Sequence, residues 1–333
     1  MSDDKLYLGI DVGGNAVKLG LVDATGRLSG KGSIPTVDMV DKVACRAFAA
    51  QVGDFVHGMG VYSSELGGVG LAIPGIITPD SYTTPNVKAD WPLLIDCVKR
   101  ALSKPSVALI NDANAAALGE MWMGAGTHAR TALLVTLGSG VGAGLIIDGN
   151  VVSGGHGAAG EVGHLTVVPE GRPCKCGREG CVERYASARG IVQTFNEAAS
   201  EEGIDASTFT DIVPAHETDA LAVFHAFEAG DARAKRALDV MTDKLGLALS
   251  QVACVIDPDI ILLGGGMAAG SDYYIDNLRA SFRSYCLASC ASTEIRCASL
   301  SGDAGVYGAA RYAMQSLPRD SENRDWLDPD FGL

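Results

Sequence analysis

Apolar runs and glycine-rich turns follow one another in two stretches of the chain. In the first stretch, apolar runs at Leu6–Asp11 and Ala16–Val22 flank a turn that contains Gly13 and Gly14, and a third strand is expected after Gly26. Short apolar runs bounded by turn residues are typical of β-strands. The pattern predicts a hairpin followed by one further strand.

The second stretch repeats this order. Apolar runs at Ala132–Leu137 and Ala143–Ile147 flank the turn 138–142, and a short strand at Val151 follows another turn. The uncharged stretch 131–147 resembles a membrane segment, but its four glycines argue against a helix there. Because one motif occurs twice, we expect two similar domains that face each other across a cleft.

Strands alternate with helices in the rest of the chain, which places the protein in the α/β class. The buried strand 107–110 runs directly into 113–123, a segment of strong helix formers. The other expected elements are a helix at 40–59, a strand at 68–73, helices between 186 and 255, a strand at 260–263 and a last helix after 302–305.

Composition and charge narrow the class of protein. The chain is 47% apolar and 20% charged, which is an ordinary composition for a globular protein. Its length of 333 residues exceeds what one hydrophobic core usually serves. A formal charge of −14 would repel a nucleic-acid backbone, so no nucleic-acid partner is expected. The first residues show neither a basic segment nor a long apolar one, so we expect a cytoplasmic protein without a membrane partner.

Nine cysteines in a chain without an export signal indicate thiols or a metal site rather than disulfides. Cys174, Cys176 and Cys181 lie within eight residues, and with His164 they form the donor set of a closed, structural Cys₃His zinc site. A cluster of free thiols is the alternative. The remaining cysteines have apolar neighbours and are expected to be buried thiols: Cys45, Cys97, Cys254, Cys286, Cys290 and Cys297.

Glycine-rich turns between strands let backbone N–H groups approach phosphate oxygens. Gly13-Gly14 and the 138–144 turn fit this use, and Asp11 before the first turn suits Mg²⁺ or its waters. A tight hairpin without a ligand would favour glycine equally. The Gly264-Gly265-Gly266 run after a buried strand suits the approach of a flat ligand such as adenine, or a plain turn.

Acidic residues stand at positions suited to catalysis and sugar binding. Asp112 lies where a buried strand meets a helix, so it is either a general base or a helix N-cap. Phosphoryl transfer needs a carboxylate that positions the attacking hydroxyl, and the paired glycine turns favour the base. Glu161, three residues before His164, and Glu183 can accept hydrogen bonds from sugar hydroxyls, unless they are solvated surface charges.

Together these residues resemble the ROK family of bacterial sugar kinases and regulators, and within it most of all the glucokinases. The likeness runs from Leu6 to about Ala313. Its markers are Ile10-Asp11-Val-Gly13-Gly14, Ile73-Pro74-Gly75, Asn111-Asp112-Ala-Asn114 through Glu120, Leu137 to Gly142, Gly160-Glu161-Val-Gly-His164 and the Cys174/Cys176/Cys181 cluster.

The resemblance implies an actin-like ATPase-domain fold of the ribonuclease H-like type, with two lobes and a cleft between them. It implies a small lobe of residues 1–112 with a helix at about 303–316 returning to it and a large lobe of 113–302 with the zinc loop. The composition of 317–333 predicts a loose acidic tail there. The family commonly forms homodimers, and we expect the same here.

The resemblance also implies roles for single residues, with ATP, Mg²⁺ and structural Zn²⁺ as the cofactors and a hexose as the partner. Asp112 would be the catalytic base, and His164 would serve both zinc and sugar. The sugar would contact Gly75, Asn111, Asp112, Glu161, His164 and Glu183. The nucleotide and Mg²⁺ would contact Asp11, Gly13, Gly14, Asn15, Gly138, Ser139, Gly140, Gly142 and, near adenosine, Gly264, Gly265 and Gly266.

One departure and two alternatives accompany this interpretation. The family usually has Thr where this chain has Asn15, so phosphate binding at that turn can differ. The substrate can be another hexose, namely fructose, mannose, allose or N-acetylmannosamine. A sugar-responsive repressor is the alternative from another class, but such repressors carry a basic helix-turn-helix module ahead of this part, and here the phosphate hairpin begins at Leu6.

Overall fold

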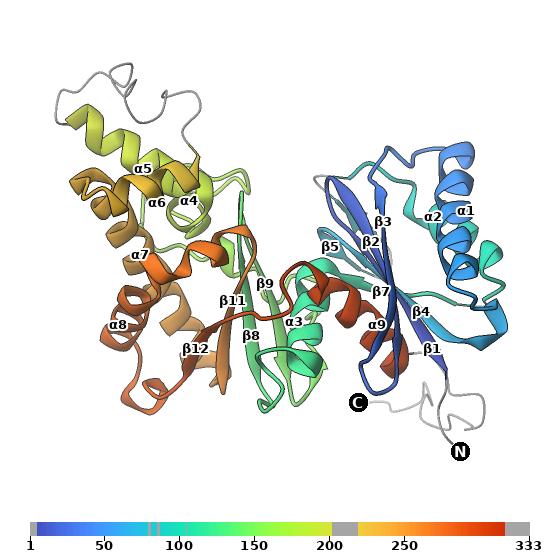
Figure 1. Ribbon diagram of the computed structural model, residues 1–333. Coiled ribbons are helices and arrows are strands. Elements are labelled where there is room, and N and C mark those ends of the chain that lie inside the picture. The colour runs from blue at the N-terminus through green and yellow to red at the C-terminus, as the bar shows by residue number, and fades with distance from the viewer. Residues whose placement is uncertain (1–4, 79–80, 85–86, 105, 202–218, 317–333) are drawn as a thin grey trace, which may run out of the picture.

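The computed structural model describes residues 5–78, 81–84, 87–104, 106–201 and 219–316. Two five-stranded sheets, each with its own helices, form two lobes with a pair of helices between them (Figure 1). The expected tail at 317–333 and part of the expected helical region, residues 202–218, lie outside the described residues.

The first sheet has the strand order β3-β2-β1-β4-β7. β1, β2 and β3 are antiparallel neighbours, whereas β4 and β7 run parallel to β1. The strands are β1 Leu6–Val12, β2 Ala16–Asp23, β3 Leu28–Pro35, β4 Leu66–Ile73 and β7 Ala108–Asn111. A small separate sheet pairs β5 Ile76–Ile77 with β6 Tyr82–Thr83.

The second sheet has the matching order β10-β9-β8-β11-β12 and the same strand directions. Its strands are β8 Ala132–Leu137, β9 Val141–Ile147, β10 Asn150–Val151, β11 Ile260–Gly264 and β12 Glu294–Cys297. The internal repeat predicted from the glycine turns is therefore confirmed, and it extends to two further parallel strands in each sheet.

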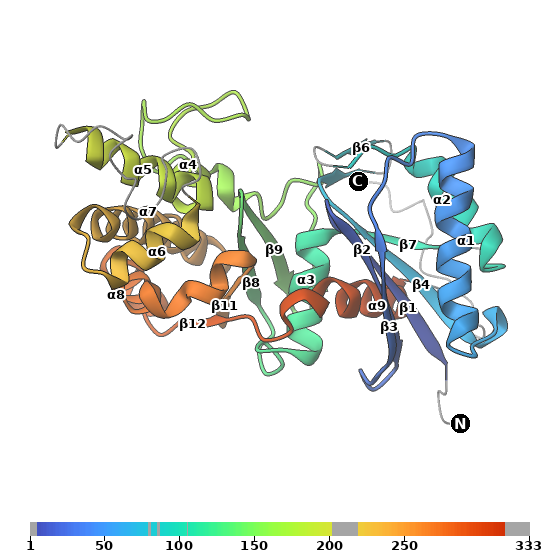
Figure 2. The ribbon, with the colours of Figure 1, turned by 45° about the horizontal axis from the view of Figure 1, so that its top comes forward.

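Helices cover both faces of each sheet, as expected for α/β proteins. α1 and α2 lie on the outer face of the first sheet, α3 and α9 lie between the sheets, and the other helices lie beyond the second sheet (Figures 1 and 2). They are α1 Lys42–Gly58, α2 Trp91–Ala101, α3 Asp112–Met123, α4 Glu183–Ala186, α5 Ala188–Glu201, α6 Ala220–Glu228, α7 Ala232–Ile256, α8 Ile275–Tyr285 and α9 Ala304–Ser316. Short 3₁₀ turns occupy η1 Ser63–Glu65, η2 Val162–His164, η4 Gly266–Tyr273, η5 Ala288–Cys290 and η6 Ser301–Asp303.

α1 illustrates how the sequence determines a helix in this fold. The Asp41 side chain accepts hydrogen bonds from the backbone N–H groups of Val43 and Ala44, which satisfies two donors that the first helical turn leaves free. The helix then buries one face, which includes Phe48 and Val52, against the first sheet. Apolar residues at helical spacing are the reason that this helix was predictable.

The central helices α3 and α9 pack against each other unusually closely. A Cβ atom at Gly308 would lie 1.6 Å from the carbonyl oxygen of Ala115, and one at Gly119 would lie 2.2 Å from that of Ala304. Only glycine fits such an approach of two backbones. Five of the eleven buried residues of the core around these helices are alanines, and this core joins residues of both sheets, so the two lobes share one apolar layer.

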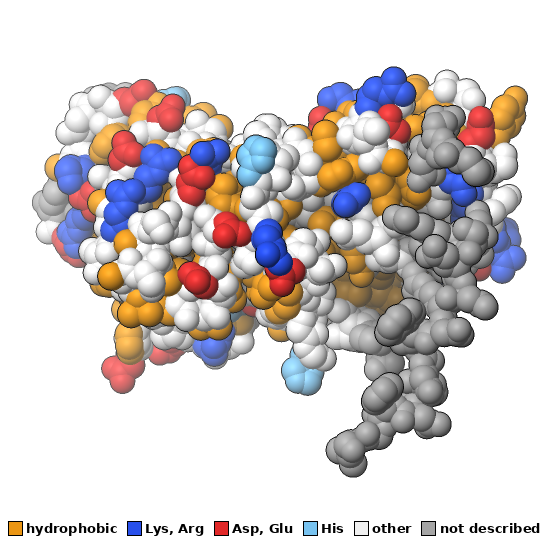
Figure 3. Space-filling model, turned by 90° about the horizontal axis from the view of Figure 1, so that it is seen from below, with side chains coloured by type: hydrophobic (Ala, Val, Ile, Leu, Met, Phe, Trp, Pro, Cys, Tyr) orange, Lys and Arg blue, Asp and Glu red, His pale blue; other side chains and the backbone are white. Residues whose placement is uncertain are grey.

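The surface carries charges of both signs. On the face seen in Figure 3, lysine and arginine side chains are interspersed with aspartate and glutamate rather than gathered into one basic patch. None of the described helices combines the length and the apolar character that a bilayer crossing requires.

Candidate active site

The carboxyl ends of three parallel strands meet at one edge of the first sheet. β1 ends just after Asp11, β4 leads to Gly75, and β7 leads to Asn111 and Asp112. In α/β proteins this edge is where ligands bind. The register of the strands therefore brings residues from distant parts of the sequence to one place.

Asp112 occupies the first turn of α3, but it is not the residue that caps the helix. Asn111 is the N-cap, and its side-chain oxygen accepts a hydrogen bond from Asn114 N at 2.9 Å. The Asn111 amide also donates to Gly75 O at 2.8 Å and to Asp112 Oδ1 at 3.0 Å. Asp112 Oδ1 accepts a further bond from Ala113 N at 2.8 Å. Since Asn111 caps the helix, the Asp112 side chain remains available to face the cleft.

Burial raises the pKa of both carboxyl groups in this region. Burial is the main cause that raises the pKa of Asp112 to about 6, and the Glu161 carboxylate adds to it, against the lowering effect of the hydrogen bonds to Oδ1. Burial, followed by the charge of Asp112, raises the pKa of Asp11 to about 6, and Lys18 opposes this rise. Asp112 is thus mostly ionised at neutral pH and remains basic enough to accept a proton.

The hairpin turn after β1 is held together from β3. Thr36 Oγ1 donates to Gly13 O at 2.7 Å, Thr36 N donates to Asn15 O at 3.1 Å, and Gly13 N donates to Ala16 O at 3.1 Å. Gly13 borders the cleft, while Gly14 and Asn15 are exposed at the tip of the turn. Thr36, the residue directly after β3, thus supplies a hydroxyl to this turn.

The second sheet contributes the other wall through the turn between β8 and β9. Gly138 N donates to Gly140 O at 3.0 Å, which closes the turn, and Val141 N donates to Glu183 Oε2 at 3.0 Å. The run from Gly264 to Gly266 follows β11, which is the next strand in this sheet, so it lies at the same edge.

These two edges enclose one cleft of about 1020 Å³. Four of the residues predicted for the site, Gly14, Asn15, Gly75 and Asn111, do not line it, although Asn111 and Gly75 bond to each other beside Asp112. The predicted residues that line it are Asp11, Gly13, Asp112, Gly138, Ser139, Gly140, Gly142, Glu161, His164, Glu183, Gly264, Gly265 and Gly266. A second cavity of about 810 Å³ along α5 shares Ser139 with this cleft.

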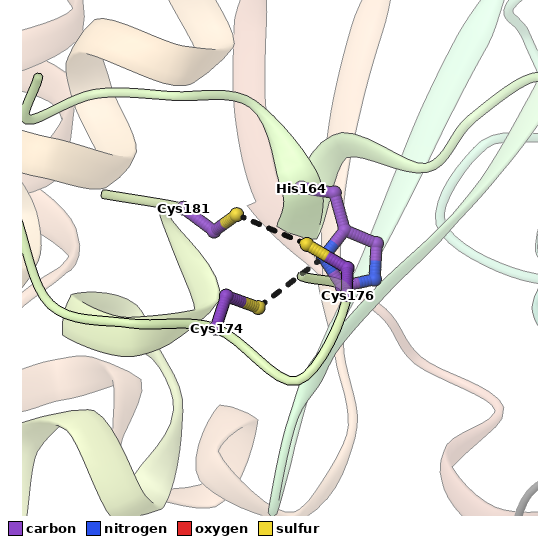
Figure 4. Close-up of side chains that lie close together, drawn as sticks. All are labelled: His164, Cys174, Cys176 and Cys181. Atoms are coloured by element: carbon purple, nitrogen blue, oxygen red, sulfur yellow. Dashed lines mark hydrogen bonds between the residues drawn. The ribbon is translucent and has the colours of Figure 1, made fainter. Parts of the chain in front are cut away.

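The cysteine-rich loop brings the four predicted metal ligands together. His164 from η2 and Cys174, Cys176 and Cys181 from the loop before α4 place their ligand atoms within 4.8 Å of one another. Cys174 Sγ lies 3.7 Å from His164 Nδ1, and Cys176 Sγ lies 3.6 Å from Cys181 Sγ (Figure 4). Three sulfurs and one imidazole nitrogen match the donors that structural zinc prefers.

His164 presents its two ring nitrogens to different partners. Nδ1 faces Cys174 in the cluster, whereas Nε2 lies 3.8 Å from Glu161 Oε2 and His164 borders the cleft. The side chain of Arg178 donates to the His164 carbonyl at 2.6 Å and so holds the backbone there. One residue therefore links the cysteine cluster to the wall of the cleft.

Several residues of the cleft had no assigned role in the sequence interpretation. Lys18 lines the cleft and donates from Nζ to Gly302 O at 2.7 Å, and the fully buried Glu120 is another of its lining residues. Thr136 and Cys297 line the second-sheet side. Glu120 belongs to the same motif as Asp112, and this was the one signal that could have pointed to it.

The expectation for the other cysteines was only partly correct. Cys45, Cys97 and Cys290 are buried, but Cys286 and Cys297 are half-buried and Cys254 is exposed. Cys254 lies on α7, whose apolar residues repeat over 25 positions, so apolar neighbours in sequence did not indicate an apolar environment.

Comparison with known proteins assigns the chain to a family. Residues 7–316 match the sequence profile of the ROK family. The chain belongs to the ROK family. The glucokinase of Halalkalibacterium halodurans is 38% identical over 94% of this chain and 96% of that protein. An N-acetyl-D-glucosamine kinase of Citrobacter koseri is 30% identical over 79% of this chain and 84% of that protein. A protein of a Caldicellulosiruptor species, described as a putative xylose repressor, is 29% identical over 82% of this chain and 69% of that protein.

Solved structures of the ROK family share this architecture. The ROK hexokinase of Thermus thermophilus superimposes with a TM-score of 0.78, at 30% identity over 93% of this chain and 98% of that one. A ROK family glucokinase of Streptomyces griseus, in complex with glucose and AMPPNP, gives a TM-score of 0.74 at 30% identity over 93% of this chain and 99% of that one. The two mixed sheets are those of the actin-like ATPase fold, as the sequence resemblance implied.

Proposed function

We propose that this ROK protein is an ATP-dependent sugar kinase that phosphorylates glucose at its 6-hydroxyl. The observation that carries the proposal is the position of Asp112, a half-buried carboxylate in a cleft between two glycine-rich turns, with a pKa raised to about 6 by burial. Such a group can orient a sugar hydroxyl and take its proton at neutral pH. The names of the relatives, glucokinases among them, support glucose as the acceptor.

The reaction follows from the residues that face the cleft. The Asp112 carboxylate accepts the proton of the 6-hydroxyl while that oxygen attacks the terminal phosphorus of ATP. The bond from phosphorus to the bridging oxygen of ADP breaks, and ADP leaves with the electron pair. The N–H groups of the turns at Gly13 and Gly138–Gly142 would hold the phosphates, since glycine leaves their backbone accessible.

Glu161, His164 and Glu183 are the proposed sugar-binding residues of the large lobe. Their side chains surround the cleft near Asp112, and carboxylates accept two hydrogen bonds each from vicinal hydroxyls. His164 Nε2 is directed to the cleft side because Nδ1 faces the cysteine cluster. Together with Asn111 they would place the 6-hydroxyl against Asp112.

Two metal ions fit the residues present. The sulfur and imidazole donors of His164, Cys174, Cys176 and Cys181 suit zinc, which would cross-link the loop between η2 and α4 without taking part in the reaction. The half-buried Asp11 carboxylate beside the first glycine turn suits Mg²⁺, which would neutralise phosphate charge when bound. With five acidic side chains lining the cleft, a triphosphate needs such compensation.

A coupled assay with ATP, Mg²⁺ and a panel of sugars tests the proposal. The panel holds glucose, fructose, mannose, allose, N-acetylmannosamine and N-acetylglucosamine, and the specificity constants are compared. We expect the highest kcat/KM for glucose. A higher value for an N-acetylated sugar would favour the second candidate, a kinase for another hexose, which the resemblance to an N-acetyl-D-glucosamine kinase supports. No turnover of any sugar would refute the kinase proposal.

The quaternary structure is a further part of the proposal. The ROK family commonly forms dimers, and we infer a homodimer for this chain as well. Light scattering after size exclusion should give twice the mass of the 333-residue chain. A mass of one chain across the concentration range of the assay would contradict it.

A further inference from the structure

One short segment carries the chain back from the second sheet to the first. It leaves β12 after Cys297, passes through Ser299 and Leu300, and enters α9 at Ala304. Ser301 and Gly302 of this segment line the cleft. We call residues 299–302 the return segment. Its position matters, because α9 begins beside Asp11, and a Cβ at Gly305 would lie 2.5 Å from the Asp11 carboxyl carbon.

Glu120 holds the return segment from the side of α3. Its Oε1 accepts a hydrogen bond from Leu300 N at 2.6 Å, and its Oε2 accepts from Ser299 N at 3.0 Å, Ser299 Oγ at 3.3 Å and Ala125 N at 2.9 Å. The side chain is fully buried. A buried carboxylate is tolerated when hydrogen bonds replace its water, and here three backbone N–H groups do so.

Among the described residues no lysine or arginine pairs with Glu120, and its partners are three backbone N–H groups and the Ser299 hydroxyl. The backbone at Gly124 also lies close to the Glu120 carboxylate, since a Cβ at Gly124 would lie 2.0 Å from Glu120 Oε2. Glu120 stands on the same helix as Asp112, two turns further along. The position of the return segment is thereby tied to the helix that carries the proposed base.

Lys18 holds the same segment from the side of the first sheet. Its Nζ donates to Gly302 O at 2.7 Å, and the strand register places Lys18 directly opposite Asp11. Side chains of such a pair share one face of the sheet. The lysine therefore ties the return segment to the strand pair that carries Asp11.

We propose that Glu120 and Lys18 are positioning residues, which clamp the return segment from α3 and from β2 and so hold the start of α9, beside Asp11, in place relative to Asp112. The inference rests on the proposed kinase function and adds to it two residues that act without touching the sugar. The mechanical reason is that phosphoryl transfer tolerates little displacement, because a shift of about 1 Å can lower a rate about 100-fold.

The chain offers a matched control for each residue. Lys31 on β3 pairs with Asp303 at 3.3 Å, next to the return segment, but its ammonium group is exposed and does not line the cleft. Asp259 also accepts two backbone hydrogen bonds from a distant segment, from Arg130 N and Thr131 N, but it lies at the end of β11 that is far from the cleft.

The test compares Glu120→Gln and Lys18→Met with the controls Asp259→Asn and Lys31→Met in the full chain. Gln brings an NH₂ group against a backbone N–H, so it breaks one side of the clamp with almost no change in volume. We measure kcat, the Kd for glucose by calorimetry, the unfolding temperature, and the exchange of amide hydrogens at 299–302 by mass spectrometry. The kinetics are measured where every variant is folded.

A clamp predicts that E120Q and K18M each lower kcat by about 10- to 100-fold, while the Kd for glucose changes less than about twofold and the controls keep their kcat. Because both residues act on one segment, the double variant should lose much less than the product of the single losses. Amide exchange at Ser299 and Leu300 should be faster in E120Q. Lys18→Arg keeps a positive charge and should therefore restore part of the kcat that K18M loses. If E120Q fails to fold, this comparison of K18M with Lys18→Arg still tests the clamp.

Three results would overturn the proposal. They are an unchanged kcat in both variants, a loss in D259N as large as that in E120Q, and a fall in glucose affinity that matches the fall in kcat. If the wild-type chain phosphorylates no sugar, the proposed function fails, and amide exchange at 299–302 alone decides whether the clamp exists.

Discussion

Glu183 Oε2 accepts a hydrogen bond from the backbone N–H of Val141 at 3.0 Å. Glu183 begins α4 two residues after Cys181, and Val141 follows the glycine-rich turn at 138–140. Both residues line the cleft. One carboxylate thus connects the loop of the cysteine cluster to the turn that is proposed to hold phosphate.

Glu183→Ala should therefore raise the KM for ATP as well as the KM for glucose. The variant removes both a sugar acceptor and the bond that holds the turn, and we expect increases of about tenfold in each constant. Glu161→Ala is the control, because Glu161 has no bond to that turn and should affect the glucose constant alone. An E183A enzyme with an unchanged KM for ATP would show that the turn is held without Glu183.

Asp112→Asn should abolish turnover but leave glucose binding intact. The amide oxygen keeps the bonds from Asn111 and Ala113, while the group that accepts the proton is lost, so kcat should fall by at least about 1000-fold. Calorimetric titration with glucose checks the folded site. A variant that retains substantial kcat would remove Asp112 from the mechanism.

The same variant should be more stable than the wild type at pH 7.5. Burial raises the pKa of Asp112 from 3.8 to about 6, so the folded state holds its proton more tightly than the unfolded state. Wild-type stability therefore falls as pH rises from about 4 to about 6 and stays lower above that range, by about 1 to 3 kcal/mol. Urea unfolding at pH 7.5 should show this gain for D112N, and at pH 4 the gain should vanish.

The rate should fall at acid pH as Asp112 becomes protonated. We expect the acid limb of kcat/KM to have its midpoint near pH 6. Since the Glu161 carboxylate raises the pKa of Asp112, Glu161→Gln should move this limb to lower pH. A limb that keeps its position in E161Q would mean that the two carboxylates do not influence each other in solution.

Zinc removal should weaken sugar binding through His164. Purified protein should contain about one zinc per chain, and Cys176→Ser should lower the metal content and weaken glucose affinity by about tenfold, because His164 loses its orientation. Cys254→Ser, at another exposed cysteine, is the control and should change neither quantity. A folded, active preparation without metal would refute the zinc assignment.

The parts of the fold that were predictable are those encoded by local patterns. Glycine turns between apolar runs located β1, β2, β8 and β9, because turn residues and strand periods act over a few positions. The spacing of Cys174, Cys176 and Cys181 likewise placed the cluster, which the structure assembles with His164. The position of Asp112 at a strand-to-helix junction was likewise predicted from a local pattern, an apolar run followed by strong helix formers.

The parts that were not predictable depend on contacts between distant residues. Lys18 and Gly302 are 284 positions apart, and Glu120 and Leu300 are 180 apart, so no pattern along the chain reveals these hydrogen bonds. The sequence analysis considered Asp112 as an N-cap, and only the geometry shows that Asn111 caps the helix instead.

The matching strand orders give the two lobes the same sheet topology. α3 follows the last strand of one sheet and α9 follows the last strand of the other, so the two helices are counterparts. Both begin at the cleft, where their N-terminal dipoles favour anions. The correspondence ends at the side chains, because Asp112 opens α3 whereas Ala304 opens α9. A duplicated scaffold can thus supply the anion-binding environment twice, while a carboxylate opens only one of the two helices.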